Sequence, residues 1–153
     1  MIAPGLFVES KGAGRNGAVI VYASRKIKDE AWTAQERATL LYAIWNHGAS
    51  VEGVAWTSDL YARLAGALRD VILIPASDLY AHCRGDTSRI INTRPHNKRG
   101  NGFGGEKYRD GWTVRTSRLR ATCTWTGFAR AQAFGVSFVA TVHTSPKLAR
   151  LIL

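Results

Sequence analysis

Acidic residues are scarce in this chain of 153 residues: 11 Asp and Glu stand against 21 Lys and Arg, which gives a formal net charge of +10. A balance this basic favours a polyanionic partner, nucleic acid first and an acidic membrane or protein surface second. The alternative is a generally basic protein without such a partner. The charge says nothing about the fold.

Several familiar signals are also missing. The two cysteines, Cys83 and Cys123, are too few for a disulfide framework, and no CxxC or zinc spacing accompanies them. No apolar run has the length of a membrane span, and the N-terminus lacks the basic and apolar regions of a signal peptide. We therefore expect a cytoplasmic or otherwise intracellular protein, bacterial or of a virus or phage, with no membrane association. The nucleotide-binding motifs GxGxxG and GxxxxGK[ST] and the nucleophile motif GxSxG are absent as well.

The length and the hydrophobic content of 46% fit one domain, residues 1–153. The clearest helical pattern covers residues 33–48, where Thr33 and Glu36 form a capping box and Gly48 is a natural stop. Residues 24–29 are expected to be exposed. Further patterns predict strands at 6–9, 18–23, 51–57, 71–75 and 136–142, a strand or hairpin at 113–125, helices at 60–68 and from Pro146 to the end, and a helical turn at 127–134.

The first two strands, joined by a glycine-rich turn, look like a hairpin. Strands and helices then alternate along the chain, which is typical of an α/β sheet. The sequence therefore predicts an α/β fold: a mixed sheet with an N-terminal hairpin and flanking helices.

A basic, glycine-rich loop is expected at about residues 84–120, which hold ten of the 21 Lys and Arg. Such a segment can follow a phosphate backbone while its aromatic side chains stack on bases. The alternative is a solvated loop whose aromatic residues belong to the core. The candidate nucleic-acid-binding residues are Arg94, Lys98, Arg99, Phe103, Lys107, Tyr108, Arg109, Trp112, Arg115 and Arg118.

Three carboxylates, Glu9, Glu36 and Asp59, are expected at strand ends and helix starts, which converge on one edge of an α/β sheet. Clustered carboxylates hold Mg²⁺ or Mn²⁺, and two such ions can activate a water for phosphodiester cleavage. Each acid also has a simpler explanation. Glu36 and Asp59 can serve as helix caps and Glu9 can be a surface residue, and His143 at a strand end is more often structural than catalytic.

The order of these features resembles the ribonuclease H fold family. The segments that carry the resemblance are FVES (7–10), GAVIVY (17–22), Glu36 with the aliphatic residues after it, TSDLY (57–61), and His143 before the last helix. The resemblance implies a ribonuclease H-like fold in which Glu9, Glu36 and Asp59 bind Mg²⁺ or Mn²⁺ and Glu36 and His143 are catalytic. It also implies that the basic loop holds the substrate.

This chain departs from the family pattern in three places. The first acid is Glu where the family usually has Asp, and the acid after the middle strand is displaced by one position. Ser145 and Pro146 stand where a fourth acid is expected; Asp78 and Asp110 are its possible substitutes.

Three functions follow from these features. The first is a nucleic-acid-processing protein, a Mg²⁺-dependent ribonuclease H-like nuclease acting on RNA, DNA or their hybrid. The second is a non-catalytic RNA- or DNA-binding protein. The third is a small-molecule enzyme working at the sheet edge with Asp59, Tyr61, Asp78 and Tyr80. The sequence leaves the oligomeric state open.

Overall fold

The computed structural model describes residues 4–13, 17–46, 66–85, 89–91, 110–133 and 135–152. The strands are β1 (Leu6–Ala13), β2 (Ala18–Tyr22), β3 (Thr39–Asn46), β4 (Asp70–Pro75), β5 (Arg89–Ile91), β6 (Asp110–Arg115), β7 (Trp125–Ala133) and β8 (Val136–Thr144). The helices are α1 (Ala23–Glu36), α3 (Ala76–Gly85), α4 (Thr116–Ala121) and α5 (Pro146–Ile152). These elements confirm the α/β class.

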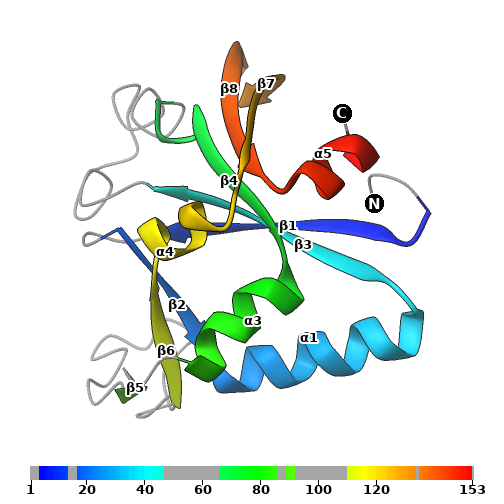
Figure 1. Ribbon diagram of the computed structural model, residues 1–153, viewed down its shortest axis with the longest axis vertical. Helices are drawn as coiled ribbons and strands as arrows, with labels where there is room; N and C mark the ends of the chain where they lie inside the picture. The colour runs from blue at the N-terminus through cyan, green and yellow to red at the C-terminus, as the bar shows by residue number, and fades with distance from the viewer. Residues whose placement is uncertain are drawn as a thin grey trace.

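The main sheet has five strands in the order β1-β3-β4-β8-β7. It is mixed, because β1 runs parallel to β3 and β4 parallel to β8, whereas the pairs β3–β4 and β8–β7 are antiparallel. The helices α1 and α3 lie on one side of β1 and β3, and α5 lies on the other (Figure 1). The prediction of a mixed sheet with flanking helices is therefore confirmed.

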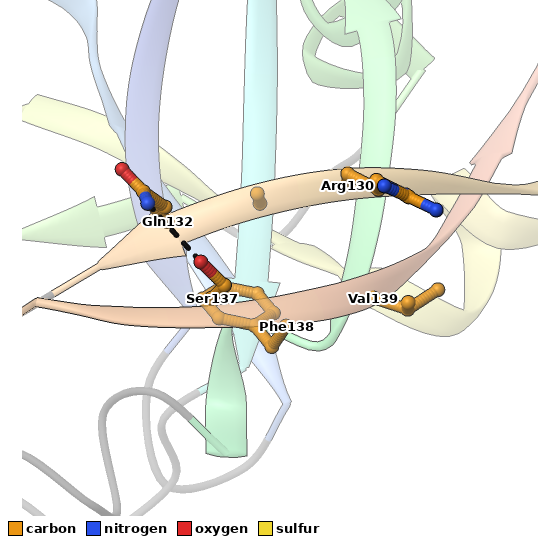
Figure 2. Close-up of a pocket in the computed structure, with 6 residues that line it drawn as sticks. Arg130, Gln132, Ser137, Phe138 and Val139 are labelled. Atoms are coloured by element: carbon orange, nitrogen blue, oxygen red, sulfur yellow. Dashed lines mark hydrogen bonds between the residues drawn. The ribbon is translucent and has the colours of Figure 1, made fainter.

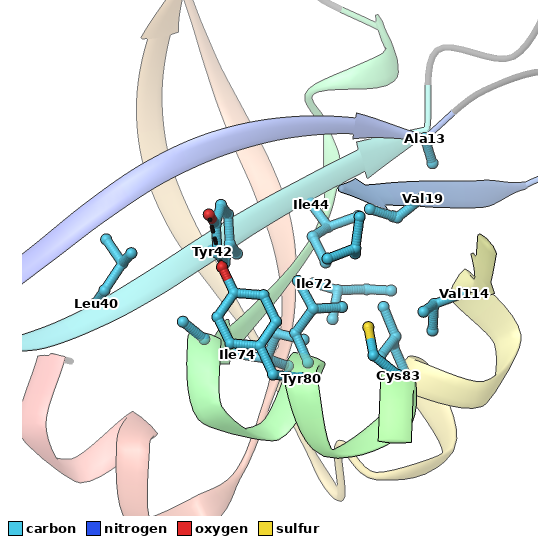
Figure 3. Packing of buried hydrophobic residues seen from close by; sticks show 14 residues of the cluster. Ala13, Val19, Leu40, Tyr42, Ile44, Ile72, Ile74, Tyr80, Cys83 and Val114 are labelled. Atoms are coloured by element: carbon cyan, nitrogen blue, oxygen red, sulfur yellow. Dashed lines mark hydrogen bonds between the residues drawn. The ribbon is translucent and has the colours of Figure 1, made fainter. Parts of the chain in front are cut away.

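A second sheet has three strands in the order β2-β6-β5. The core lies between this sheet, the main sheet and α3 (Figure 3). It contains Val19 and Val21 from β2, Ile44 from β3, Ile72 from β4 and Leu79 from α3, all at most 2% exposed. Gly111 of β6 lies so close to β2 that an added Cβ would be 2.4 Å from the carbonyl oxygen of Val21. This close approach is the reason why β6 carries glycine there.

The prediction of a helix at residues 33–48 is wrong. Helix α1 ends at Glu36, Arg37 adopts a left-handed conformation with φ of 49°, and the strand β3 begins at Thr39. Thr33 is not an N-cap, because its hydroxyl donates to the carbonyl oxygen of Asp29 at 2.8 Å, one turn earlier in the same helix. Residues Leu40 to Ile44 form a continuous apolar run, because this part of β3 is mostly buried on both faces of the sheet and has no polar side to show. A continuous run satisfies helical and strand spacing equally.

Three other predictions are also wrong. The first two strands form no hairpin, because β1 pairs with β3 while β2 pairs with β6 in the other sheet. Residues 116–121 of the expected strand or hairpin form α4, and residues 127–133 of the expected helical turn form β7. Residues 24–29 belong to α1 and are mostly exposed, as expected, with Asp29 as the buried exception.

The strands at 71–75 and 136–142 and the terminal helix are confirmed as β4, β8 and α5. The strand expected at 51–57 and most of the helix expected at 60–68 lie outside the described residues. In the part of the chain that is described, none of the helices combines the length and the apolar character needed to cross a membrane.

Candidate functional site

The most unusual side chain of the core is Asp29, a carboxylate that is only 6% exposed. The hydroxyls of Tyr42 and Tyr80 both donate to its Oδ2 atom. The Nε atom of Arg25, one turn earlier in α1, lies 3.0 Å from Oδ1. A buried charge is tolerated when it is paired and hydrogen-bonded in this way. Asp29 therefore joins α1 to β3 and α3.

The two tyrosines are held close together in the core, with their oxygens 3.3 Å apart (Figure 3). Burial and, as a smaller cause, the hydrogen bond to Asp29 together raise the pKa of Tyr42 to about 12. Burial and the hydrogen bond to Asp29 also raise the pKa of Tyr80. Both hydroxyls therefore stay protonated donors at neutral pH.

A hollow of about 300 Å³ opens next to this cluster, at the N-terminus of α1. Three cationic side chains line it, namely those of Lys11, Arg25 and Lys28, together with Glu9, Ser10, Tyr22, Ser24 and Tyr42. We call this hollow the basic pocket. Its lining carries three positive charges and one negative charge, so it suits an anion.

Two residues of the basic pocket come from the same side of β1. Glu9 and Lys11 are two residues apart in the strand, so their side chains project to one face. The carboxylate of Glu9 forms an ion pair with Arg25, whereas the ammonium of Lys11 lies 5.8 Å from the ring centre of Tyr42. Burial lowers the pKa of Lys11, and the carboxylate of Glu9 opposes that effect.

The backbone at this end of α1 also favours an anion. The N-cap residue Tyr22 makes no side-chain cap hydrogen bond, and the first turn contains no acid. The first N–H groups of a helix lack partners within the helix and carry a partial positive charge. They add to the positive potential that the three cationic side chains create.

His143 lies in a different cluster. Its Nε2 atom is 2.8 Å from Oδ1 of Asp70, and its Nδ1 atom is 3.2 Å from the hydroxyl oxygen of Thr126. Arg120 of α4 lies 3.2 Å from the other oxygen of Asp70. When the Nε2–H group donates a hydrogen bond to Asp70, Nδ1 can accept a hydrogen bond from the hydroxyl of Thr126. His143 thus links β8 to β4 and β7.

The structure does not bring Glu9, Glu36 and His143 together. Glu36 is exposed at the C-terminal end of α1, and Arg25, the partner of Glu9, is in its first turn. Eleven residues of helix separate Arg25 from Glu36, about 16 Å along the axis. Three strand spacings, about 14 Å, separate β1, which carries Glu9, from β8, which carries His143.

Asp59, the third expected metal ligand, lies outside the described residues. Among the residues that are described, no three His, Cys, Asp or Glu side chains stand together as metal ligands would. Glu9 is ion-paired with Arg25. The expected Mg²⁺ or Mn²⁺ site therefore stays a prediction.

Most of the expected nucleic-acid-binding residues, from Arg94 to Arg109, also lie outside the described residues. Trp112 is half-buried and packs against the core, as the alternative reading of the loop has it. Arg115 and Arg118 are exposed at the end of β6 and in α4.

Comparison of the chain with known proteins identified no relative. The chain has no significant match among protein-family models, curated proteins or solved structures. Its function therefore has to be argued from the residues themselves.

Of the residues proposed for a small-molecule enzyme, the two that the structure describes have different surroundings. Tyr80 is buried against Asp29, and Asp78 lines a separate hollow of about 310 Å³ with His82 and Cys123. Asp59 and Tyr61 lie outside the described residues.

Sequence reasoning missed Asp29 and Lys11. The spacing of Arg25 and Asp29, four residues apart, is a helix signal that was available. The basic pocket itself was not predictable, since its lining comes from β1, β2, α1 and β3.

Proposed function

We propose that this protein binds nucleic acid and that the basic pocket holds a phosphate of the backbone. The observation that carries the proposal is the convergence of Lys11, Arg25 and Lys28 on one hollow at the start of α1. Positively charged side chains and the N–H groups of a helix N-terminus are the usual partners of phosphate oxygens. The net charge of +10 supplies the long-range attraction for a polyanion.

Within the pocket the three cations have different roles. Arg25 is held in place by Glu9 on one side and Asp29 on the other, so its guanidinium is oriented before any ligand arrives. Lys28 is exposed one turn further along α1. Lys11 is partly buried, and burial disfavours its charged form. A bound phosphate would stabilise that charged form by its negative charge.

A second candidate function is cleavage of the bound strand. It is favoured by two groups that line the basic pocket together. One is the carboxylate of Glu9, and the other is the amine of Lys11, whose pKa is lowered by burial. Groups of this kind serve in general acid–base catalysis. The metal-dependent form of this reaction, with a ribonuclease H-like arrangement, requires Asp59 or other acids to join Glu9.

The experiment is a binding and cleavage assay on labelled single strands, duplexes and hybrids of RNA and DNA, with Mg²⁺, Mn²⁺ or EDTA. Charge reversal by Lys28→Glu should weaken binding roughly tenfold or more. The matched control is Lys147→Glu, which makes the same charge change at an exposed position of α5, on the other side of β1 and β3 (Figure 1). Equal weakening in both variants, or none in Lys28→Glu, would contradict the assignment of the pocket.

Cutting is read in the same samples. Cleavage that EDTA abolishes and that Glu9→Gln removes would establish the nuclease. Binding without cutting would leave the protein as a binder.

A further inference from the structure

At the edge of the main sheet opposite β1, the strands β7 and β8 project as a two-stranded arm. Strand β4 pairs with β8 only from Thr141 to His143, whereas β7 and β8 pair with each other along their whole length. Within the described residues, 129–133 and 136–140 therefore form a ribbon that extends beyond β4, with Phe128 at its base. We call this ribbon the arm, and Figure 1 shows β7 and β8 rising away from the helices.

One face of the arm presents an aromatic ring beside a cation. Phe128 is 74% exposed, and Arg130 follows two residues later on the same side of β7. Across the ladder, Arg130 pairs with Val139 and Gln132 pairs with Ser137. The side chain of Gln132 donates to the hydroxyl of Ser137 at 3.1 Å. Phe128 and Val139, which is 57% exposed, make this face apolar as well as basic.

A shallow hollow of about 640 Å³ follows the arm (Figure 2). Arg130 and Val139 lie on adjacent strands at one end of it, and Gln132 and Ser137 at the other. The hollow thus offers a cation, an amide and a hydroxyl beside apolar surface. These groups suit the phosphate, the polar edges and the flat faces of nucleotides.

The charge of this region selects the class of partner. From Gly111 to the C-terminus the sequence contains six Lys and Arg and no Asp or Glu. The acid closest to the arm in the ladder is Asp70, which pairs with Thr141 and is already bound to His143 and Arg120. A partner that meets this face is therefore attracted when it is negatively charged.

We propose that the arm binds single-stranded nucleic acid, with a base stacked on Phe128 and a neighbouring phosphate held by Arg130. The proposal rests on the proposed function and adds a preference for single strands. Stacking requires an uncovered base face, which a duplex does not offer. The arm and the basic pocket then hold different parts of the ligand, since they lie at opposite edges of the main sheet.

The test is fluorescence anisotropy on a labelled 20-nucleotide single strand and on the matching duplex. Phe128→Ala should weaken binding of the single strand about tenfold and leave the duplex within twofold. Phe128→Leu, which keeps an apolar side chain but has no ring, should lose nearly as much. Val136→Ala is the matched control, because Val136 is an apolar residue of β8 in the arm at 49% exposure and does not line the hollow. Circular dichroism confirms that each variant folds.

The outcomes separate the two proposals. If the wild-type protein binds neither ligand, both fail. If it binds both ligands equally and Phe128→Ala changes neither, the proposal for the arm is overturned while the basic pocket stands. If Phe128→Ala instead converts a dimer into a monomer in light scattering and single-strand binding is unchanged, the arm is a self-association surface and the proposal is again overturned.

Discussion

At the scale of single residues, the buried carboxylate of Asp29 links the stability of the fold to the geometry of the candidate site. It accepts hydrogen bonds from Tyr42 and Tyr80 and pairs with Arg25, which itself lines the basic pocket. The same contacts that satisfy a buried charge therefore orient a cation of the basic pocket. A change at Asp29 should disturb both stability and binding.

Replacing Asp29 by Ala should lower the free energy of unfolding by about 3 kcal/mol, because two tyrosine hydroxyls and a guanidinium lose their shared partner. Urea denaturation measures the loss. Glu36→Ala is the control, since Glu36 is an exposed acid of the same helix, and it should stay within about 0.5 kcal/mol of the wild type. A loss below about 1 kcal/mol in Asp29→Ala would mean that the cluster contributes little.

Alkaline pH should destabilise the protein through Tyr42. Its pKa is raised from 10.0 to about 12 in the folded chain, so between these values the unfolded chain releases the proton and the folded chain keeps it. The free energy of unfolding must then fall as the pH rises from 10 to 12. The raised pKa of Tyr80 acts in the same direction.

Denaturation at a series of pH values tests this expectation. Tyr42→Phe lacks the ionisable group and should show a shallower fall over the same range. Identical slopes in Tyr42→Phe and the wild type would show that the Tyr42 hydroxyl is not held as the structure has it.

At the scale of the elements, the sequence predicted strands and helices best where flanking signals were unambiguous. The apolar segment of β4, the β-branched β8 and the proline that opens α5 were identified correctly. For the stretch 39–46 the sequence predicts a helix, because a strand buried on both faces has no alternation of apolar and polar residues. The pairing of β1 with β3 was not predictable from the turn between β1 and β2, since it depends on contacts distant in sequence.

The close pairing of β2 and β6 gives a prediction at this scale. Gly111→Ala should lower the free energy of unfolding by about 2 kcal/mol, because the new Cβ would meet the Val21 carbonyl at 2.4 Å and push the strands apart. Gly66→Ala is the control, since an added Cβ there meets nothing within 4 Å. Thermal melts of the two variants compare them directly, and equal stabilities would contradict the described packing of β2 on β6.

At the scale of the whole molecule, the net charge predicts a polyanionic partner but not where such a partner would bind. The basic pocket is assembled from β1, β2, α1 and β3, and strand β2 separates Lys11 in sequence from Arg25 and Lys28 of α1. The expected acids illustrate the same limit, because Glu9 and Glu36 are associated with opposite ends of α1. Pattern reading identified charged residues, whereas their grouping depends on the topology of the main sheet.

The most direct test of the basic pocket is the salt dependence of duplex binding. The slope of log K against log salt counts the phosphates that the protein neutralises, at about −0.9 for each contact. In the double variant Lys11→Met, Lys28→Ala, this slope should be shallower than in the wild type by about 2, because both cations are lost. Lys147→Ala should change the slope by less than about 0.5. A slope in the double variant equal to that of the wild type would contradict the claim that the pocket binds phosphate.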